Sequence, residues 1–196
     1  MDHIGMSPGG ESLIEDMVTL AELKRGESLL DIGCGDGDTI AVLSERYGLI
    51  CAGLDRTDRA DQPQPVPVLS CEHLYDAVLF ECVLSTMDDL SGSVRMASKL
   101  LSAGGRLIVA DLCGRNGVTP KGAIDTAELD AICRACGLTL KGREDRTKDL
   151  DTFAAEVILS YGSFEAYFNS VKCPLTAFCR LDRAAPPPGY FLAVYG

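Results

Sequence analysis

The chain has 196 residues, of which 46% are hydrophobic and 24% charged, so wholesale disorder is excluded and a single domain is expected over residues 1–196. A chain of this length can bury enough surface to fold without disulfide bonds or structural metals. Eighteen basic residues against 29 acidic ones give a net charge of −11, which argues against binding to nucleic acid or to an anionic membrane.

Short apolar runs alternate with helical patterns along the chain. Strands are expected at residues 29–33, 49–54, 66–69, 76–80, 106–112, 138–142 and 190–195. Helices are expected at residues 12–23, 39–47, 90–101, 126–136 and 149–171. This alternation predicts βαβ units and a doubly wound, mostly parallel α/β sheet, which binds ligands beyond the carboxyl ends of its strands.

Local signals mark several element ends. Asp36 or Asp38 is the candidate N-cap of the helix at 39–47. Residues 102–105, Ser-Ala-Gly-Gly, indicate a helix stop and a turn before the next strand. Gly137 is expected to end the helix at 126–136.

The N-terminus and the cysteines indicate where the protein works. No signal peptide and no apolar run of membrane-spanning length is visible. The nine cysteines are an odd count and fall mostly in apolar runs, which is typical of reduced thiols. We therefore expect a cytoplasmic protein without a bound metal.

A glycine-rich turn follows the first expected strand. The sequence DIGCGDG begins at Asp31 and places glycines at 33, 35 and 37, which lets the backbone approach a ligand closely. The following helix offers its N-terminal amides, and Asp55 at the end of the second strand can accept hydrogen bonds from both ribose hydroxyls. The dinucleotide fingerprint requires a third glycine where this chain has Asp38, which argues against a nicotinamide-dependent oxidoreductase. A second acid at the turn repels a pyrophosphate, and it favours a ligand that carries an amine or a sulfonium group.

Four segments resemble the motifs of class I S-adenosylmethionine-dependent methyltransferases. They are LLDIGCGDG at 29–37, GLDR at 53–56, YDAVLFECVLSTMDD at 75–89 and LLSAGGRLIVADL at 100–112. The resemblance covers about residues 8–145 and 190–195, and it is closest to small-molecule enzymes such as the quinone-biosynthesis and arsenite methyltransferases. It implies a Rossmann-like sheet of seven strands in the order 3-2-1-4-5-7-6, with the last strand antiparallel.

The same resemblance implies S-adenosyl-L-methionine as cofactor and S-adenosyl-L-homocysteine as product. Asp31 and the glycine turn would hold the methionine end, and Asp55 the ribose. Where the family usually has Asp-Ala-Glu beside the adenine, this chain has Ser-Cys-Glu at 70–72, so backbone amides there are expected to make the contact. The residues expected to contact the cofactor are Asp31, Gly33, Cys34, Gly35, Gly37, Asp55, Arg56, Cys71, Glu72, Glu81 and Cys82.

Candidate catalytic groups are few. Methyl transfer needs an in-line nucleophile, and a general base helps when the acceptor atom is oxygen or nitrogen. The candidates are Asp111, Glu81 and His73. Asp111 alternatively caps a helix or bonds a loop, Glu81 contacts either cofactor or acceptor, and His73 is alternatively exposed on the surface.

The expected acceptor is a small molecule. The chain lacks both the Asn/Asp-Pro-Pro-aromatic signature of amino methylation after its fourth strand and the Pro-Cys pair of cytosine methylation. One alternative is a metalloid methyltransferase whose thiolates come from Cys82, Cys113, Cys173 and Cys179, although buried cysteines more often act as small apolar residues. Another alternative is a non-catalytic, cofactor-binding accessory protein with this fold. A monomer or a homodimer is expected.

Residues 143–188 form a long insert between the last two strands. A connection of this length is usually functional or flexible. We expect a helical element that forms part of the acceptor pocket, or a lid with the Pro-Gly-Gly segment at 8–10; a dimer contact or added packing is the alternative. The Cys133-x-x-Cys136 pair has no second pair for a zinc site and is expected to pack in the core.

Overall fold

The computed structural model describes residues 7–55, 74–170 and 186–196. In this part of the chain, six strands form one sheet in the order β2-β1-β3-β4-β6-β5. Their bounds are β1 Ser28–Ile32, β2 Ile50–Leu54, β3 Tyr75–Glu81, β4 Leu101–Cys113, β5 Leu140–Asp145 and β6 Gly189–Tyr195. The pairs among β2, β1, β3 and β4 are parallel, whereas β6 runs antiparallel to both β4 and β5.

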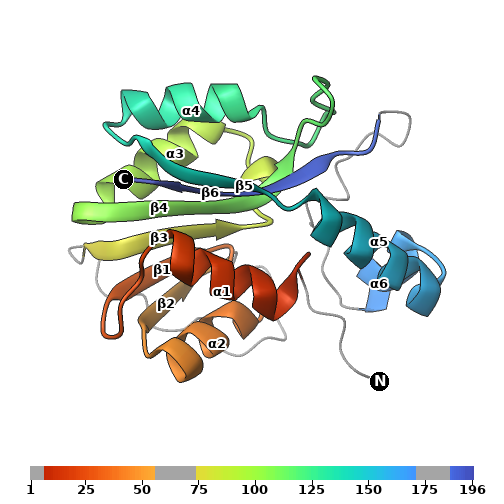
Figure 1. Cartoon of the computed structure of the whole chain (residues 1–196), viewed down its shortest axis with the longest axis horizontal. Helices are drawn as coiled ribbons and strands as arrows, with labels where there is room; N and C mark the ends of the chain where they lie inside the picture. Colours follow the sequence, from red (N-terminus) through yellow and green to blue (C-terminus); the bar gives the residue numbers. More distant parts are fainter. Residues whose placement is uncertain (1–6, 56–73, 171–185) are drawn as a thin grey trace.

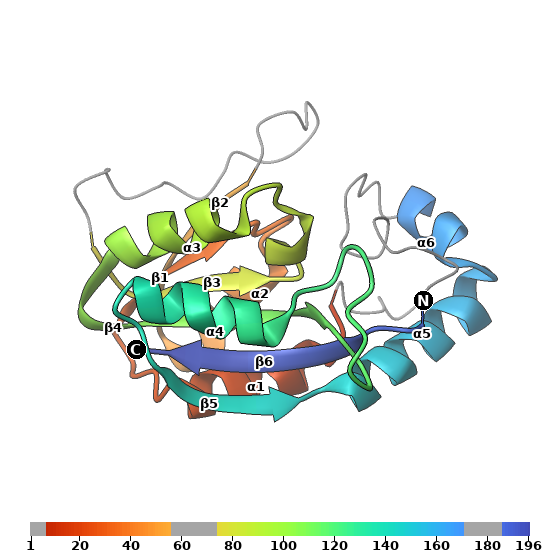
Figure 2. The ribbon, with the colours of Figure 1, turned by 90° about the horizontal axis from the view of Figure 1, so that it is seen from above.

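Helices cover both faces of this sheet. Their bounds are α1 Gly10–Leu20, α2 Asp38–Tyr47, α3 Leu90–Lys99, α4 Thr126–Ala135, α5 Thr147–Tyr161 and α6 Phe164–Ser170, with a 3-10 turn η1 at Leu84–Thr86. Helices α1 and α2 lie on one face, and α3 and α4 lie on the other (Figure 1). Helices α5 and α6 lie beyond the end of the sheet at which β3 and β4 terminate, as Figure 2 shows from a second direction.

Each face of the sheet has its own hydrophobic core. On the α1 and α2 side, Leu79 of β3 joins Leu13 and Leu43 in one cluster of buried residues. On the α3 and α4 side, Val78 and Phe80 belong to a second buried cluster. Alternate residues of β3 thus enter opposite cores, which explains why a strand covered on both faces has a continuous apolar sequence.

The expected doubly wound α/β class is confirmed. The six described strands follow the expected order, and the last strand is antiparallel as expected. The structure shows six strands where seven were expected, because the short strand expected at 66–69 lies outside the described residues.

Two expectations about helix ends are wrong. The N-cap of α2 is Gly37 and neither Asp36 nor Asp38, because Gly37 adopts the left-handed conformation with φ 87° and no side chain caps the helix. The helix expected at 149–171 is two helices, since α5 ends where Gly162 adopts φ 77°, and α6 begins at Phe164. A left-handed glycine commonly ends a helix in this way.

Two strand boundaries also differ from expectation. Strand β4 begins at Leu101 and not at Arg106, and the turn expected at 102–105 is an irregularity within that strand. Tyr75 pairs with Leu101, but Ala77 pairs with Arg106, so residues 102–105 bulge out with Gly104 at φ 79°. Strand β5 covers Leu140–Asp145 instead of 138–142, since its register is set only by the neighbouring β6.

Candidate functional site

The glycine turn after β1 adopts backbone conformations that favour glycine. Gly33, Gly35 and Gly37 have φ of 88°, 55° and 87°. The N–H of Gly33 donates a 2.6 Å hydrogen bond to the carbonyl of Leu54 at the end of β2. A Cβ atom on Gly33 would lie 2.5 Å from Cγ2 of Val83, so the segment after β3 closes directly against this turn. A side chain at position 33 would therefore be both strained and obstructed.

Cys34 fills space behind the turn. A Cβ atom on Gly53 of β2 would lie 2.6 Å from Sγ of Cys34 and 2.7 Å from Cδ1 of Ile40. The Cys34 side chain therefore packs against β2 beside α2. The contact expected between Cys34 and the cofactor stays a prediction.

Asp55 joins the end of β2 to the turn. The backbone N–H of Gly35 donates a 2.6 Å hydrogen bond to Oδ2 of Asp55. Strands β1 and β2 are parallel neighbours, so both segments emerge at the same edge of the sheet. This edge is where ligands of doubly wound sheets bind.

Asp31 is a buried acid with an unsatisfied oxygen. Its side chain is 2% exposed, and Oδ1 has no hydrogen-bond partner among the described residues. Burial raises the pKa of this carboxyl well above its usual value, and the neighbouring Glu81 and Asp55 raise it further. A buried carboxyl oxygen that makes no hydrogen bond costs free energy, so Oδ1 of Asp31 is a candidate contact for a positively charged ligand.

Glu81, the last residue of β3, is the second acid of this site. Its Oε2 accepts a 2.7 Å hydrogen bond from the hydroxyl of Thr39 in the first turn of α2. Its Oε1 is buried and has no partner within the described part of the chain. Burial raises the pKa of Glu81, while the nearby hydroxyls of Ser7 and Thr39 lower it.

Cys82 follows Glu81 in a left-handed backbone conformation with φ 53°. Its N–H donates to the carbonyl of Ala110 at 2.8 Å, and its Sγ lies 3.2 Å from the hydroxyl oxygen of Tyr190. Burial, followed by the charges of Asp111 and Glu81, raises the pKa of the Cys82 thiol well above its usual value. Cys82 is therefore a neutral thiol at physiological pH.

The carboxyl of Asp111 accepts hydrogen bonds from Ser85, in the segment that follows β3. The carboxyl is fully buried; Oδ2 accepts from the Ser85 N–H at 2.9 Å and Oδ1 from the Ser85 hydroxyl at 2.6 Å. The N–H of Leu112 also donates to Oδ1, at 2.7 Å. Burial raises the pKa of Asp111 and these hydrogen bonds lower it. The arrangement ties η1 to β4 and favours the loop-bonding alternative over direct contact with an acceptor.

The structure brings most of the expected turn residues together. Asp31, Asp55 and Glu81 lie around the glycine turn at the ends of three adjacent strands. Other expected site residues lie outside the described residues: Arg56, Cys71, Glu72 and His73. The adenine-side contacts and the role of His73 therefore stay predictions.

The thiols of the described residues form no metal centre. Within residues 7–55, 74–170 and 186–196, no group of three or more His, Cys, Asp or Glu side chains could hold a metal ion. Burial raises the pKa of Cys113 to about 11 and that of Cys133 to about 12. Cys133 packs in the core beside Leu129, as expected. The remaining thiols of the metalloid hypothesis, Cys173 and Cys179, lie outside the described residues.

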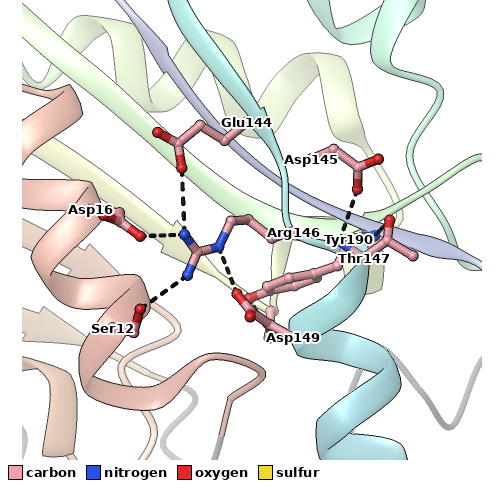
Figure 3. Close-up of polar contacts among 9 residues, drawn as sticks. Ser12, Asp16, Glu144, Asp145, Arg146, Thr147, Asp149 and Tyr190 are labelled. Atoms are coloured by element: carbon pink, nitrogen blue, oxygen red, sulfur yellow. Dashed lines mark hydrogen bonds and ion pairs between the residues drawn. The ribbon is translucent and has the colours of Figure 1, made fainter.

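Arg146 connects the N-terminal helix to the insert, and sequence reasoning missed it. At the start of α5, its Nε donates to Oδ2 of Asp149 at 2.6 Å, and its Nη1 forms an ion pair with Asp16 of α1 (Figure 3). Ser12 of α1 and Glu144 of β5 complete the group, at 3.4 Å and 3.5 Å. Asp16 and Ser12 are 130 and 134 residues from Arg146 in the sequence, so no local pattern could reveal these two contacts.

Thr39 is the other residue that sequence reasoning missed. Its hydroxyl reaches Glu81 across 42 residues of chain. A threonine two positions after the last glycine of the turn is the only available signal, and it does not identify the partner.

Together, the sheet and the glycine turn define a Rossmann-like α/β protein with an acidic ligand site at the carboxyl edge of its strands. A family model described as a methyltransferase domain matches residues 11–137, more than half of the chain. The chain therefore belongs to this methyltransferase-domain family. The matched region contains the glycine turn, Asp55 and Glu81.

Individual relatives are distant in sequence. Phosphoethanolamine N-methyltransferase 1 from Zea mays is 24% identical over 125 residues, which are 55% of this chain and 25% of the maize protein. A SAM-dependent methyltransferase from Geobacter sulfurreducens, in complex with S-adenosyl-L-homocysteine, has a similar structure with a TM-score of 0.69 at 14% identity. That match covers 100% of this chain and 94% of the Geobacter chain.

Phosphoethanolamine N-methyltransferase 2 from Haemonchus contortus also shares the fold. Its complex with phosphomonomethylethanolamine and S-adenosylhomocysteine gives a TM-score of 0.68 at 16% identity. The match covers 97% of this chain and 53% of that chain. This chain thus spans a quarter of the maize protein and about half of the Haemonchus protein.

In the described part of the chain, no helix combines the length and the apolar character needed to cross a membrane.

Proposed function

We propose that this protein transfers a methyl group from S-adenosyl-L-methionine to a small-molecule acceptor. The observation that supports this most directly is the buried Asp31, whose Oδ1 lacks a partner beside a turn built on left-handed glycines. Family membership supports the reaction type, since the matched model is that of a methyltransferase domain.

The cofactor fits the residues present. Its methionine end is held by Asp31 and the backbone of Gly33 and Gly35, where the left-handed turn brings main-chain atoms to the surface of the site. The ribose hydroxyls bond to Asp55, which already accepts from Gly35. Glu81 lines the site from β3. When bound, the cofactor supplies an electrophilic methyl group on a sulfonium; the chain positions it and the acceptor in line.

A small molecule is the proposed acceptor. The maize and Haemonchus relatives are named for phosphoethanolamine, and the net charge of −11 disfavours nucleic acid. The acceptor atom stays unassigned. A cytoplasmic location and a monomeric or homodimeric state stay predictions.

The insert at 143–188 is proposed to cover the acceptor. Helices α5 and α6 lie beyond the end of the sheet from which the site residues emerge (Figure 2). At the start of α1, a Cβ atom on Gly9 would lie 3.1 Å from Oδ2 of Asp149, so the N-terminal segment touches the first turn of α5. Deleting residues 163–185 should lower acceptor turnover while sparing cofactor affinity. Loss of cofactor affinity in a folded variant would contradict this division.

The activity test is formation of S-adenosyl-L-homocysteine in an acceptor screen. The screen includes phosphoethanolamine, simple amines, phenols, thiols and arsenite, each with S-adenosyl-L-methionine. We expect acceptor-dependent turnover that falls in the Asp55→Ala variant and persists in Glu45→Gln, an exposed change on the outer side of α2. Turnover that does not depend on Asp55 would contradict the proposed site.

A further inference from the structure

We infer that Asp31 and Glu81 form a carboxyl pair that selects a cationic ligand and releases a proton when that ligand binds. The inference rests on the proposed function and deepens it, because it assigns to Glu81 a part in choosing the charge state of the cofactor. The exchange is balanced: the ligand brings positive charge to the site, and one proton leaves the pair for solvent.

The geometry places two unsatisfied carboxyl oxygens in one site. Asp31 is 2% exposed and its Oδ1 has no partner, and Oε1 of Glu81 is likewise buried without a partner among the described residues. The two acids lie at the ends of adjacent parallel strands, where Ile32 of β1 pairs with Phe80 of β3. Their charges interact, since Glu81 raises the pKa of Asp31.

The remaining oxygen of Glu81 is fixed. The Thr39 hydroxyl donates to Oε2 at 2.7 Å, which leaves Oε1 for a ligand. Because Thr39 lies in the first turn of α2, the carboxyl of Glu81 is held beside the glycine turn that begins that helix.

Other ionisable groups lie near the pair. Asp55 after β2 and Cys51 of β2 interact with Asp31, and Cys82 after β3 and Tyr190 of β6 interact with Glu81. Burial raises the pKa of Cys51, Cys82 and Tyr190, so these three groups are neutral at neutral pH. Ser7 and Thr39 contribute neutral hydroxyls. Two like charges desolvated together favour one retained proton, so the pair in the free protein keeps a proton at a pH at which an exposed carboxyl has lost it.

A cation between the two oxygens reverses this preference. The ammonium group of the cofactor can donate to both Asp31 and Glu81, and two carboxylates then bond one cation. Binding must therefore release a proton, and affinity must rise with pH, by up to tenfold per unit for one proton. Such a site discriminates against ligands that lack the ammonium group.

The test is calorimetric titration of the whole chain with S-adenosyl-L-homocysteine, a ligand with an ammonium group and no reactive methyl. Titrations at pH 6.5 in phosphate and in imidazole separate the heat of binding from the heat of buffer protonation. We expect net proton release on binding, and a binding constant that increases from pH 6 to pH 8. In Glu81→Gln the released proton and the pH dependence should disappear, with affinity at pH 8 falling about tenfold.

Thr39→Val is the matched control variant. It removes the hydrogen bond to Oε2 but keeps the carboxyl, so proton release should persist. Equal heats in both buffers, or unchanged release in Glu81→Gln, would overturn the inference while leaving the proposed function intact. Absence of binding by the parent protein at every pH would overturn both. Folding of each variant is verified by circular dichroism, and Asp31→Asn serves in place of Glu81→Gln if that variant unfolds.

Discussion

The backbone N–H of Gly35 donates a 2.6 Å hydrogen bond to Oδ2 of Asp55. This bond joins the turn after β1 to the end of β2, and it holds an acid at the position where a ribose is proposed to bind. The turn itself positions this acid in the free protein. The ligand then meets a site that needs little rearrangement, which favours tight binding.

Replacing Asp55 tests the ribose contact. Asp55→Ala should weaken binding of S-adenosyl-L-methionine by about 1.5–3 kcal/mol, the range for a hydrogen bond to a charged group. Asp55→Asn retains the acceptor for Gly35 and should lose less. The measurement is calorimetric titration, with Glu45→Gln as the exposed control. Unchanged affinity in Asp55→Ala would refute the placement of the ribose.

Gly33→Ala tests the close approach of Val83 to the turn. The added Cβ would lie 2.5 Å from Cγ2 of Val83 at a residue with φ 88°, whereas a Cβ at Gly104, with φ 79°, meets nothing within 4 Å. Both variants suffer strain of about 1–2 kcal/mol from the left-handed conformation, and Gly33→Ala adds an overpacking penalty of about 1–3 kcal/mol. Thermal unfolding should therefore show a larger loss for Gly33→Ala, together with weaker cofactor binding. Equal losses in the two variants would contradict the packing described.

Asp31→Asn should separate stability from binding. Since the folded pKa of Asp31 is raised, its contribution to stability is present below the unfolded pKa of about 3.9 and is lost as pH rises through the folded pKa. Asn cannot ionise, so the variant should be more stable than the parent at neutral pH, by a margin that widens from pH 5 to pH 8. Cofactor affinity should fall in parallel. A variant that is less stable than the parent at pH 8 would show that Asp31 has a structural partner.

Arg146→Met tests the link between α1 and α5. The arginine side chain is 13% exposed, and its removal leaves Asp16, Glu144 and Asp149 close together. Partial exposure of these acids moderates the cost, so we expect a loss of about 2 kcal/mol, lowering Tm by roughly 4–8 °C. Arg115→Met is the control, since its pair with Asp151 is largely exposed and should contribute about 0–1 kcal/mol. Equal shifts in Tm would count against the role given to Arg146.

The thiols should differ in reactivity. Burial raises the pKa of Cys133 to about 12, whereas Cys136 on the same helix end is partly exposed. Because the thiolate is the nucleophile, iodoacetamide at pH 7.5 should modify Cys136 and leave Cys133 unmodified in the folded protein. Peptide mapping by mass spectrometry reads the outcome. Rapid modification of Cys133 would mean that the α4 side of the core opens readily.

The fold could be predicted well from sequence because its signals are local. The continuous apolar run Val78–Leu79–Phe80 is typical of a strand that is covered on both faces. The glycine turn is recognised from the spacing of its three glycines. Gly162 is visible in the sequence, but apolar residues continue at helical spacing across it, so the break between α5 and α6 was missed. The cap at Gly37 was missed because capping by Asp36 or Asp38 depends on backbone angles that sequence does not specify.

The site could be predicted only in part. Asp55 and Glu81 were identified because they lie at the ends of strands, and the ends of parallel strands meet at one edge. Asp31 was identified because it belongs to the DIGCGDG segment, which resembles the first motif of the family. Their partners could not be identified: Thr39 reaches Glu81 across 42 residues, and Arg146 reaches Asp16 across 130 residues. Such contacts depend on how helices dock on the sheet, which no local pattern determines.

The measurement that tests the central claim most directly is parallel calorimetric titration with S-adenosyl-L-methionine, S-adenosyl-L-homocysteine and NADH. The acidic site around Asp31, with Asp38 in place of a third glycine, predicts micromolar binding of the first two ligands and none of NADH. Binding of NADH alone, or of none of the three by the folded protein, would contradict the account.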